Sequence, residues 1–199
     1  MKRSISCAAA ILLGTLLSAC SVLPRPQSVQ LLDPRPETPR AMGETAPWSL
    51  SVRRPETDPA RDSANVFVRT ADGRLQVHPV ARWVAPAPDL MQTMLVRYLR
   101  DAQALESIDA AIGGERELAI DLRRFELAES AGGGLALAIA MDVRLLAAAN
   151  ARVVARRVFR RETPLSEDHS GRIVDAAESA FSALLGELAD WLAAQPPPE

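Results

Sequence analysis

The sequence predicts a single α+β domain, with two main helices packed on one face of an antiparallel or mixed β-sheet. Residues 117–165 contain three successive segments of alternating apolar side chains, which is typical of half-buried strands joined by short turns. Two other segments, residues 89–104 and the stretch after Pro164, repeat apolar residues every three or four positions, as amphipathic helices do. Only 4% of the residues are aromatic although 48% are hydrophobic, so alanine, leucine and valine must fill the core.

Shorter strands are expected before the first helix. Trp48–Val52 alternate apolar and polar side chains, and Val66–Arg69 form a second short apolar run. Asp72 and Gly73 are a hairpin signal, after which a third strand begins at Leu75. This strand is expected to end at Pro79, because proline cannot donate to a sheet ladder.

The first helix is expected to start at Pro88 or Asp89 and to run to about Ala104. Trp83 precedes the proline-containing turn that leads into it, and two interpretations of this side chain stay open. It either plugs the core and fixes the start of the helix, or presents an apolar edge to a partner or a lipid tail. Trp83 and Met91 are therefore the candidate partner contacts.

The first long strand carries a defect in its alternation. Leu118, Ile120 and Leu122 share one parity, whereas Phe125 and Leu127 have the other. A β-bulge around Arg123–Arg124 would bring all five to the core side. The next strand has its apolar residues on odd positions: Leu135, Leu137, Ile139, Met141, Val143 and Leu145. The third strand has the apolar residues Val153, Ala155 and Phe159. They are interleaved with a run of arginines, which are Arg152, Arg156, Arg157, Arg160 and Arg161. This arginine run is either a solvated strand face or a contact with anionic lipid or a partner.

The closing helix is expected to begin after Pro164, with Ser166 or Asp168 as its N-cap. Its apolar stripe extends over four turns, and the prolines from Pro196 onward end it. The stripe contains Ala177, Phe181, Leu184, Leu185, Leu188 and Leu192.

The N-terminus has the pattern of a bacterial lipoprotein signal. Lys2 and Arg3 precede an apolar run that is too short to span a bilayer as a mature helix, and Leu17-Ser18-Ala19-Cys20 follows it as a lipobox. We expect cleavage between Ala19 and Cys20 and lipid attachment at Cys20. The alternative is an ordinary signal peptide followed by an accidental cysteine. No later apolar run is long enough for a second membrane segment.

Four segments are expected: a signal peptide at 1–19, a lipidated N-terminus and proline-rich tether at 20–47, the α+β domain at 48–194 and a proline-rich tail at 195–199. An extended tether of this length reaches roughly 80 Å at about 3.1 Å per residue. Val29, Leu31 and Leu32 are apolar residues within this otherwise polar segment. The alternative to a fully extended tether is therefore that part of it docks on the domain.

Composition and spacing exclude several classes of function. Loss of Lys2 and Arg3 with the signal leaves 21 basic residues against 25 acidic ones, which argues against a nucleic-acid partner. Asp168-His169-Ser170 has the side chains of a hydrolase triad, but adjacent residues rarely face one another, and a helix start explains them better. The glycines at 132–134 lack a following Lys-Ser/Thr, and the two histidines provide no zinc-ligand spacing. We therefore expect no catalytic residues, no metal site and no cofactor.

The chain resembles the ABC-type transport auxiliary lipoproteins, whose best-known members are the paraquat-inducible type that accompanies MCE-domain proteins. The matching features are the lipobox, the proline-rich spacer, the strand at Trp48–Val52 and the final helix ending at Trp191-Leu192. In addition, the stretch Arg82–Met91 is similar to the Trp-x-x-Pro-Pro sequence with which the family enters its first helix. Two positions depart from the pattern: His78 stands where the family tends to have tyrosine, and Ala87 separates the paired prolines.

The resemblance implies a non-enzymatic lipoprotein on the periplasmic face of the outer membrane of a Gram-negative cell. Its implied partners are an MCE-domain protein and the permease and ATPase of an ABC transporter that moves phospholipid or another hydrophobic molecule between membranes, and self-association into a homo-oligomer is also expected. Ser21 is not the aspartate associated with inner-membrane retention, which favours outer-membrane sorting. The alternative function is a lipoprotein that supports outer-membrane assembly or envelope structure.

Overall fold

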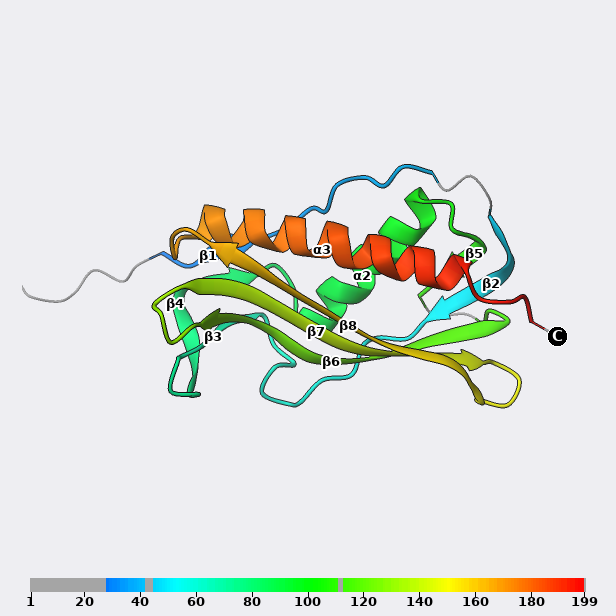
Figure 1. The fold of residues 1–199 in the computed structure, drawn as a ribbon, viewed down its shortest axis with the longest axis horizontal. Helices are drawn as coiled ribbons and strands as arrows, with labels where there is room; N and C mark the ends of the chain where they lie inside the picture. The colour runs from blue at the N-terminus through cyan, green and yellow to red at the C-terminus, as the bar shows by residue number, and fades with distance from the viewer. Residues whose placement is uncertain (1–27, 42–44, 111–112, 199) are drawn as a thin grey trace, which may run out of the picture.

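The computed structural model describes residues 28–41, 45–110 and 113–198, and in these ranges eight strands form one mixed sheet with two helices on the same face (Figure 1). The α+β prediction is confirmed. The elements are β1 Gln30–Leu32, β2 Ala46–Val52, β3 Asn65–Arg69, β4 Leu75–Trp83, α2 Ala87–Asp101, β5 Leu105–Asp109, β6 Arg116–Glu129, β7 Leu135–Ala147, β8 Val153–Leu165 and α3 Ser170–Ala193.

The long strand β6 is the centre of the sheet. Along one edge it pairs antiparallel with β7, which pairs antiparallel with β8, so the predicted three-strand meander is confirmed. Along the other edge it pairs parallel with β2 near its start and with β3 near its end, where Leu50 faces Arg116 and Val68 faces Leu127. β5 extends the β2 side, and β4 and β1 extend the β3 side. Two short groups of strands therefore lie end to end beside β6.

The predicted bulge in β6 is present. The register between β6 and β7 shifts between Leu122 and Arg124, so one residue of β6 has no opposite partner. As a result Ile120 and Leu122 before the bulge and Phe125 and Leu127 after it are all buried.

The prediction that Pro79 ends the third strand is wrong, because β4 continues to Trp83. The register between β3 and β4 shifts at this point, which removes the need for a ladder hydrogen bond from proline. The buried imidazole of His78 supplies the missing acceptor: its Nδ1 accepts the main-chain N–H of Ala81 at 2.9 Å and that of Val80 at 3.3 Å.

Helix α2 ends at Asp101, three residues before the predicted end. Gln103 follows in the left-handed region, with φ of 52°, and redirects the chain into β5, a strand that the sequence did not indicate. Only Leu105 and Ile108 of β5 are buried, so its apolar pattern is too short to be recognised.

Helix α3 begins later than predicted, and neither Ser166 nor Asp168 caps it. His169 is the N-cap, and its Nδ1 accepts the main-chain N–H of Arg172 at 3.4 Å. Asp168 instead lies 3.3 Å from Nε2 of His78 on β4. Because the Asp168 side chain contacts the sheet, the adjacent residue His169 caps the first turn of the helix.

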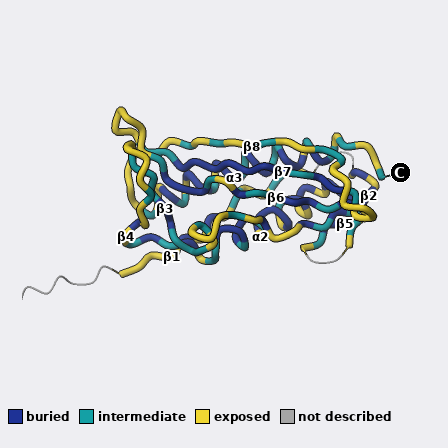
Figure 2. The backbone as a smooth tube through the Cα atoms, turned by 90° about the horizontal axis from the view of Figure 1, so that it is seen from below, coloured by how far each residue is buried: buried dark blue, intermediate teal, exposed yellow. Residues whose placement is uncertain are grey.

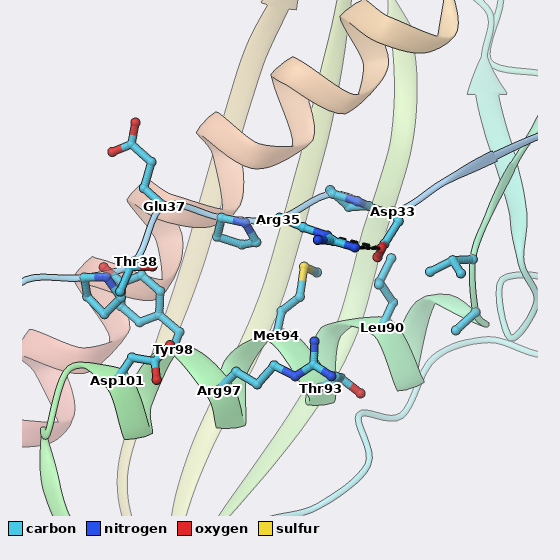
Figure 3. A pocket seen from close by; sticks show the side chains of 15 residues that line it. Asp33, Arg35, Glu37, Thr38, Leu90, Thr93, Met94, Arg97, Tyr98 and Asp101 are labelled. Carbon is cyan, nitrogen blue, oxygen red and sulfur yellow. Dashed lines mark hydrogen bonds and ion pairs between the residues drawn. The ribbon is translucent and has the colours of Figure 1, made fainter.

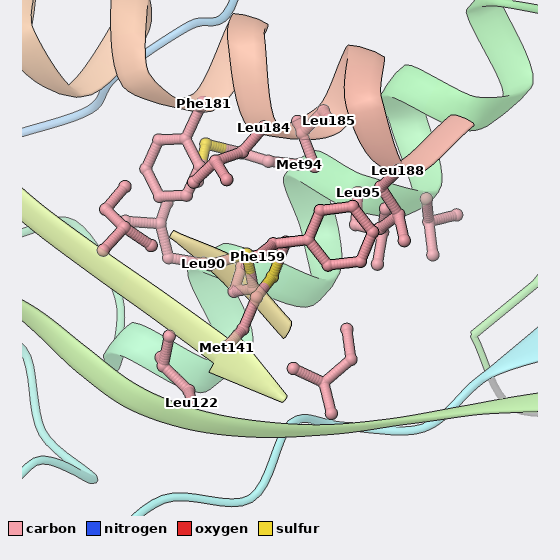
Figure 4. Close-up of a cluster of buried hydrophobic side chains, with 14 of the residues drawn as sticks. Leu90, Met94, Leu95, Leu122, Met141, Phe159, Phe181, Leu184, Leu185 and Leu188 are labelled. Atoms are coloured by element: carbon pink, nitrogen blue, oxygen red, sulfur yellow. The ribbon is translucent and has the colours of Figure 1, made fainter. Parts of the chain in front are cut away.

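The core lies between the two helices and the sheet. Phe181, Leu184, Leu185 and Leu188 of α3 face Leu90, Met94 and Leu95 of α2, and both sets lie over Leu122, Met141 and Phe159 of the sheet (Figure 4). Burial follows this layer along the whole molecule, whereas the loops and the outer sides of the helices are exposed (Figure 2).

Candidate functional site: the groove beside the N-terminal strap

The predicted lipid-attachment and cleavage residues, Cys20 and Ala19, lie outside the described residues. The described chain joins the domain at β1, which pairs parallel with β4. Leu32 is 3% exposed, but Val29 and Leu31 are 56% and 68% exposed. Docking on the domain is the alternative that the sequence leaves open for the tether. The part of the tether around Leu32 is docked in this way. The ten residue-to-residue steps from Cys20 to Gln30 span at most about 35 Å, which is less than half of the reach expected for residues 20–47.

Residues 33–39, which we call the strap, continue from β1 along helix α3. The main-chain N–H of Arg35 donates to Oε1 of Glu178 at 2.9 Å, and that of Glu37 donates to Oγ of Ser182 at 2.9 Å. Two residues of extended proline-rich chain advance about 6.2 Å, and four helix residues advance about 6 Å. The two hydrogen bonds are therefore in register with one turn of α3.

A groove of about 490 Å³ separates the strap from helix α2 (Figure 3). Leu90 and Met94 form its floor and are 5% and 6% exposed, and Val84 and Ala85 line the end nearest β1. The volume lies within the usual range of ligand pockets. The groove can hold a narrow apolar chain.

The rim of the groove is charged. Arg35 forms an ion pair with Asp33 at 3.1 Å, and Arg97 and Asp101 project from α2. Among the residues that the structure describes, the guanidinium of Arg97 has no ion-pair or hydrogen-bond partner. Burial, together with the nearby carboxylates of Asp190 and Glu37, raises the pKa of Tyr98 at the far end, so its hydroxyl stays protonated. The groove thus combines an apolar floor with a rim of mixed charge, where Arg97 has no partner among the described residues and the carboxylates of Glu37 and Asp101 also line the groove.

The two candidate partner contacts lie in the core. Trp83 is 1% exposed and its ring stacks on Phe125, with centroids 4.6 Å apart and an interplanar angle of 14°. Met91 is also 1% exposed. The core-plug interpretation describes Trp83 in this structure. A partner contact through either side chain stays a prediction, and it would require this packing to open.

The helix-free side of the sheet holds a cluster around Glu126 that sequence reasoning missed. The Glu126 side chain is fully buried, and its carboxylate accepts from Arg69 at 2.6 Å, Arg61 at 2.8 Å and Arg124 at 3.3 Å. Burial alone would raise the pKa of Glu126, but the hydrogen bonds from Arg69 and Arg61 outweigh it and lower the pKa below its usual value. The acid is held ionised as the centre of an ion cluster.

Asp142 is the second buried acid on this side. It accepts hydrogen bonds from Arg156 and Arg123, and the bond from Arg156 is the main cause of its lowered pKa. Arg161 on the same strand as Arg156 instead pairs with Glu187 of α3 at 2.6 Å. The arginine run of β8 is therefore not one solvated face, because its members pair on opposite sides of the sheet.

Other chemistries find no support in the described part of the chain. No group of three or more His, Cys, Asp or Glu side chains there is placed to hold a metal ion. His169 serves as a helix cap, and Ser170 is the first residue of α3. None of the described helices is long and apolar enough to cross a membrane.

The model of the family described as the ABC-type transport auxiliary lipoprotein component matches residues 30–189, a span that begins at β1 and ends within α3. The chain belongs to this family. The family is described as a transport auxiliary lipoprotein component and not as a family of enzymes. The match includes the strap, so the strap is part of the family domain.

Solved structures show the same fold. Protein XCC0632 from Xanthomonas campestris is 29% identical, covers 82% of this chain and 94% of its own, and has a TM-score of 0.77. An uncharacterised protein is 16% identical, covers 75% of this chain and 99% of its own, and has a TM-score of 0.62. No curated protein is significantly similar in sequence to this auxiliary lipoprotein.

Proposed function

We propose that this auxiliary lipoprotein is anchored by lipid on Cys20 to the periplasmic face of the outer membrane and serves as the adaptor of an MCE-type ABC transport system. The transported molecule is a phospholipid or another hydrophobic compound. The observation that carries the proposal is the family match over residues 30–189, which begins at β1, includes all of α2 and ends near the C-terminal end of α3.

The attachment of the chain to the domain supports this arrangement. A single acyl chain gives only marginal membrane binding, whereas two or more hold a protein firmly. With at most about 35 Å of chain between Cys20 and Gln30, the anchor confines the domain to a thin layer beside the membrane. Confinement of this kind raises the local concentration of the domain for a partner that spans the periplasm.

The partner is tested by purifying the full-length acylated protein from membranes in mild detergent. An MCE-domain protein, with its permease and ATPase, is expected to co-purify. Recovery of an outer-membrane assembly factor in place of the MCE protein would favour the alternative function. Recovery of the lipoprotein alone would contradict the proposal.

The anchor is tested by two substitutions and membrane fractionation. Cys20→Ala removes the thiol that is acylated, and it is expected to take the protein out of the outer-membrane fraction. Ser21→Asp keeps the thiol but introduces the inner-membrane retention signal, and it is expected to move the acylated protein to the inner membrane. A wild-type N-terminal peptide without lipid in the mass spectrum would refute the anchoring.

A further inference from the structure

We propose that the groove between the strap and helix α2 binds an acyl chain of a membrane phospholipid, with the lipid phosphate held by Arg97. The inference rests on the proposed anchor at Cys20, because the anchor places the groove beside a source of lipid. The proposed function requires only that the domain be anchored near the membrane, whereas this inference makes the domain itself a lipid-binding site.

Val84 gives the groove an exposed apolar edge at the end nearest β1. Val84 lines the groove, is 49% exposed, and its main-chain N–H donates to the carbonyl of Leu32 at 2.9 Å. Leu32 pairs with Trp83, and both are buried. Because side chains alternate along strands, Leu31 and Val84 project to the opposite, exposed side. Val29 is exposed as well, but of these three side chains only Val84 lines the groove.

A polar end for the lipid lies further along α2. Thr93 and Arg97 are one helical turn apart, both are exposed, and both line the groove (Figure 3). Arg97 lies seven residues beyond Leu90, or about 10 Å along the helix axis. A guanidinium is well suited to bind phosphate, and the Thr93 hydroxyl can donate a second hydrogen bond. Arg35 is already paired with Asp33, and the carboxylates of Glu37 and Asp101 disfavour an anion at the far end. Arg97 is the lining arginine that has no partner among the described residues, and we therefore assign the phosphate to it.

The strap favours an acyl chain over a peptide as the occupant. Pro34, Pro36 and Pro39 have no main-chain N–H, and the N–H groups of Arg35 and Glu37 already donate to α3. A peptide in the groove would find few main-chain donors on this wall, and its own polar backbone would lose water without compensation. A hydrocarbon chain has no such requirement.

The test is photocrosslinking of the acylated full-length protein in vesicles of phosphatidylethanolamine that contain phosphatidylglycerol. The photoreactive residue p-benzoylphenylalanine replaces Val84 in one variant and Val77 in the matched control. Both valines lie at or beside β4 and are similarly exposed, 49% and 44%, but only Val84 lines the groove. Irradiation followed by mass spectrometry is expected to give a phospholipid adduct at Val84 and at most a minor one at Val77.

The Arg97→Gln substitution distinguishes the groove from simple proximity to the bilayer. It is expected to lower the Val84 adduct roughly tenfold, the effect of losing one charge-assisted hydrogen bond. Arg160→Gln, which changes an exposed arginine on β8 away from the groove, is expected to leave the adduct unchanged.

Each other outcome overturns the inference. Equal adducts at Val84 and Val77 would show only membrane proximity, and an adduct with the protein's own Cys20 lipopeptide would make the anchor the occupant. Absence of an adduct would also refute it. The mass of the N-terminal peptide in the same sample reports acylation independently, so a failed anchor is distinguished from an empty groove.

Discussion

The main-chain N–H of Arg35 donates to the carboxylate of Glu178 at 2.9 Å, across 143 residues of sequence. Together with the bond from Glu37 to Ser182, it fastens the strap to α3 and forms one wall of the groove. Both acceptors are side chains on the helix surface, so the attachment can be removed without touching the core.

We predict that replacing both acceptors, Glu178→Ala with Ser182→Ala, loosens the strap. Each hydrogen bond contributes about 0.5–1.5 kcal/mol, so the loss of both is expected to cost roughly 1–3 kcal/mol locally. Amide hydrogen exchange of Arg35 and Glu37 should accelerate about tenfold, while exchange in β7 stays slow. Glu187→Ala removes a different α3 carboxylate, the partner of Arg161, and serves as the control. Unchanged exchange at Arg35 in the double variant would show that the strap is held by other contacts.

The cluster around Glu126 leads to a second prediction. Glu126→Leu leaves the guanidinium groups of Arg61 and Arg69 without their buried partner, and it is expected to lower the free energy of unfolding by about 3–5 kcal/mol. Glu162→Leu removes an exposed partner of Arg124 and should change stability by less than about 1 kcal/mol. Urea unfolding measures both variants, and equal losses would refute the distinction.

The same cluster predicts the acid response. The pKa of Glu126 is lower in the folded protein than its ordinary value of 4.5, so its contribution to stability is complete above that value and is lost as the pH falls through the lower, folded pKa. Asp142 acts in the same direction, from an ordinary value of 3.8. We expect the free energy of unfolding to fall as the pH drops below about 4.5. The fall should be smaller in Glu126→Gln, and an identical slope in that variant would contradict this assignment.

A fourth prediction concerns Trp83. Because its ring is buried and stacked on Phe125, Trp83→Ala is expected to cost about 3–5 kcal/mol. Val84→Ala, at the next and exposed position, should cost less than about 0.5 kcal/mol. Thermal unfolding of the two variants gives the comparison. If Trp83→Ala unfolded like the wild-type protein but lost its transport partner, the partner-contact interpretation would hold after all.

Local periodicity was sufficient to predict the elements that bury one continuous face. The parity change between Leu122 and Phe125 predicted the bulge of β6, and the three-to-four spacing of apolar residues predicted both helices. Each signal lies within a single element, where burial on one side imposes its period on the residue pattern.

Interactions between distant segments leave no such pattern. β5 has only two buried residues, and β1 is three residues long, so their parallel pairing with β2 and β4 is set by tertiary contacts. The groove depends on the prolines of the strap lying beside α2, and the Glu126 cluster brings together arginines from a loop and two strands. The sequence indicates the residue types in these sites but not which of them meet.

Gly114 and Gly113 provide the last prediction. A β-carbon at Gly114 would lie 2.7 Å from the carbonyl oxygen of Ser49 and 2.7 Å from the main-chain nitrogen of Ser51, whereas one at Gly113 would contact nothing within 4 Å. The close approach at Gly114 is to the backbone of β2, which pairs with β6 and β5 and cannot yield as a side chain would. Gly114→Ala is therefore expected to lower the free energy of unfolding by about 1–3 kcal/mol or more, as overpacking does. Gly113→Ala should change it by less than about 0.5 kcal/mol. Urea unfolding of the two variants decides the matter, and equal stabilities would mean that β2 does not run against the start of β6 as described.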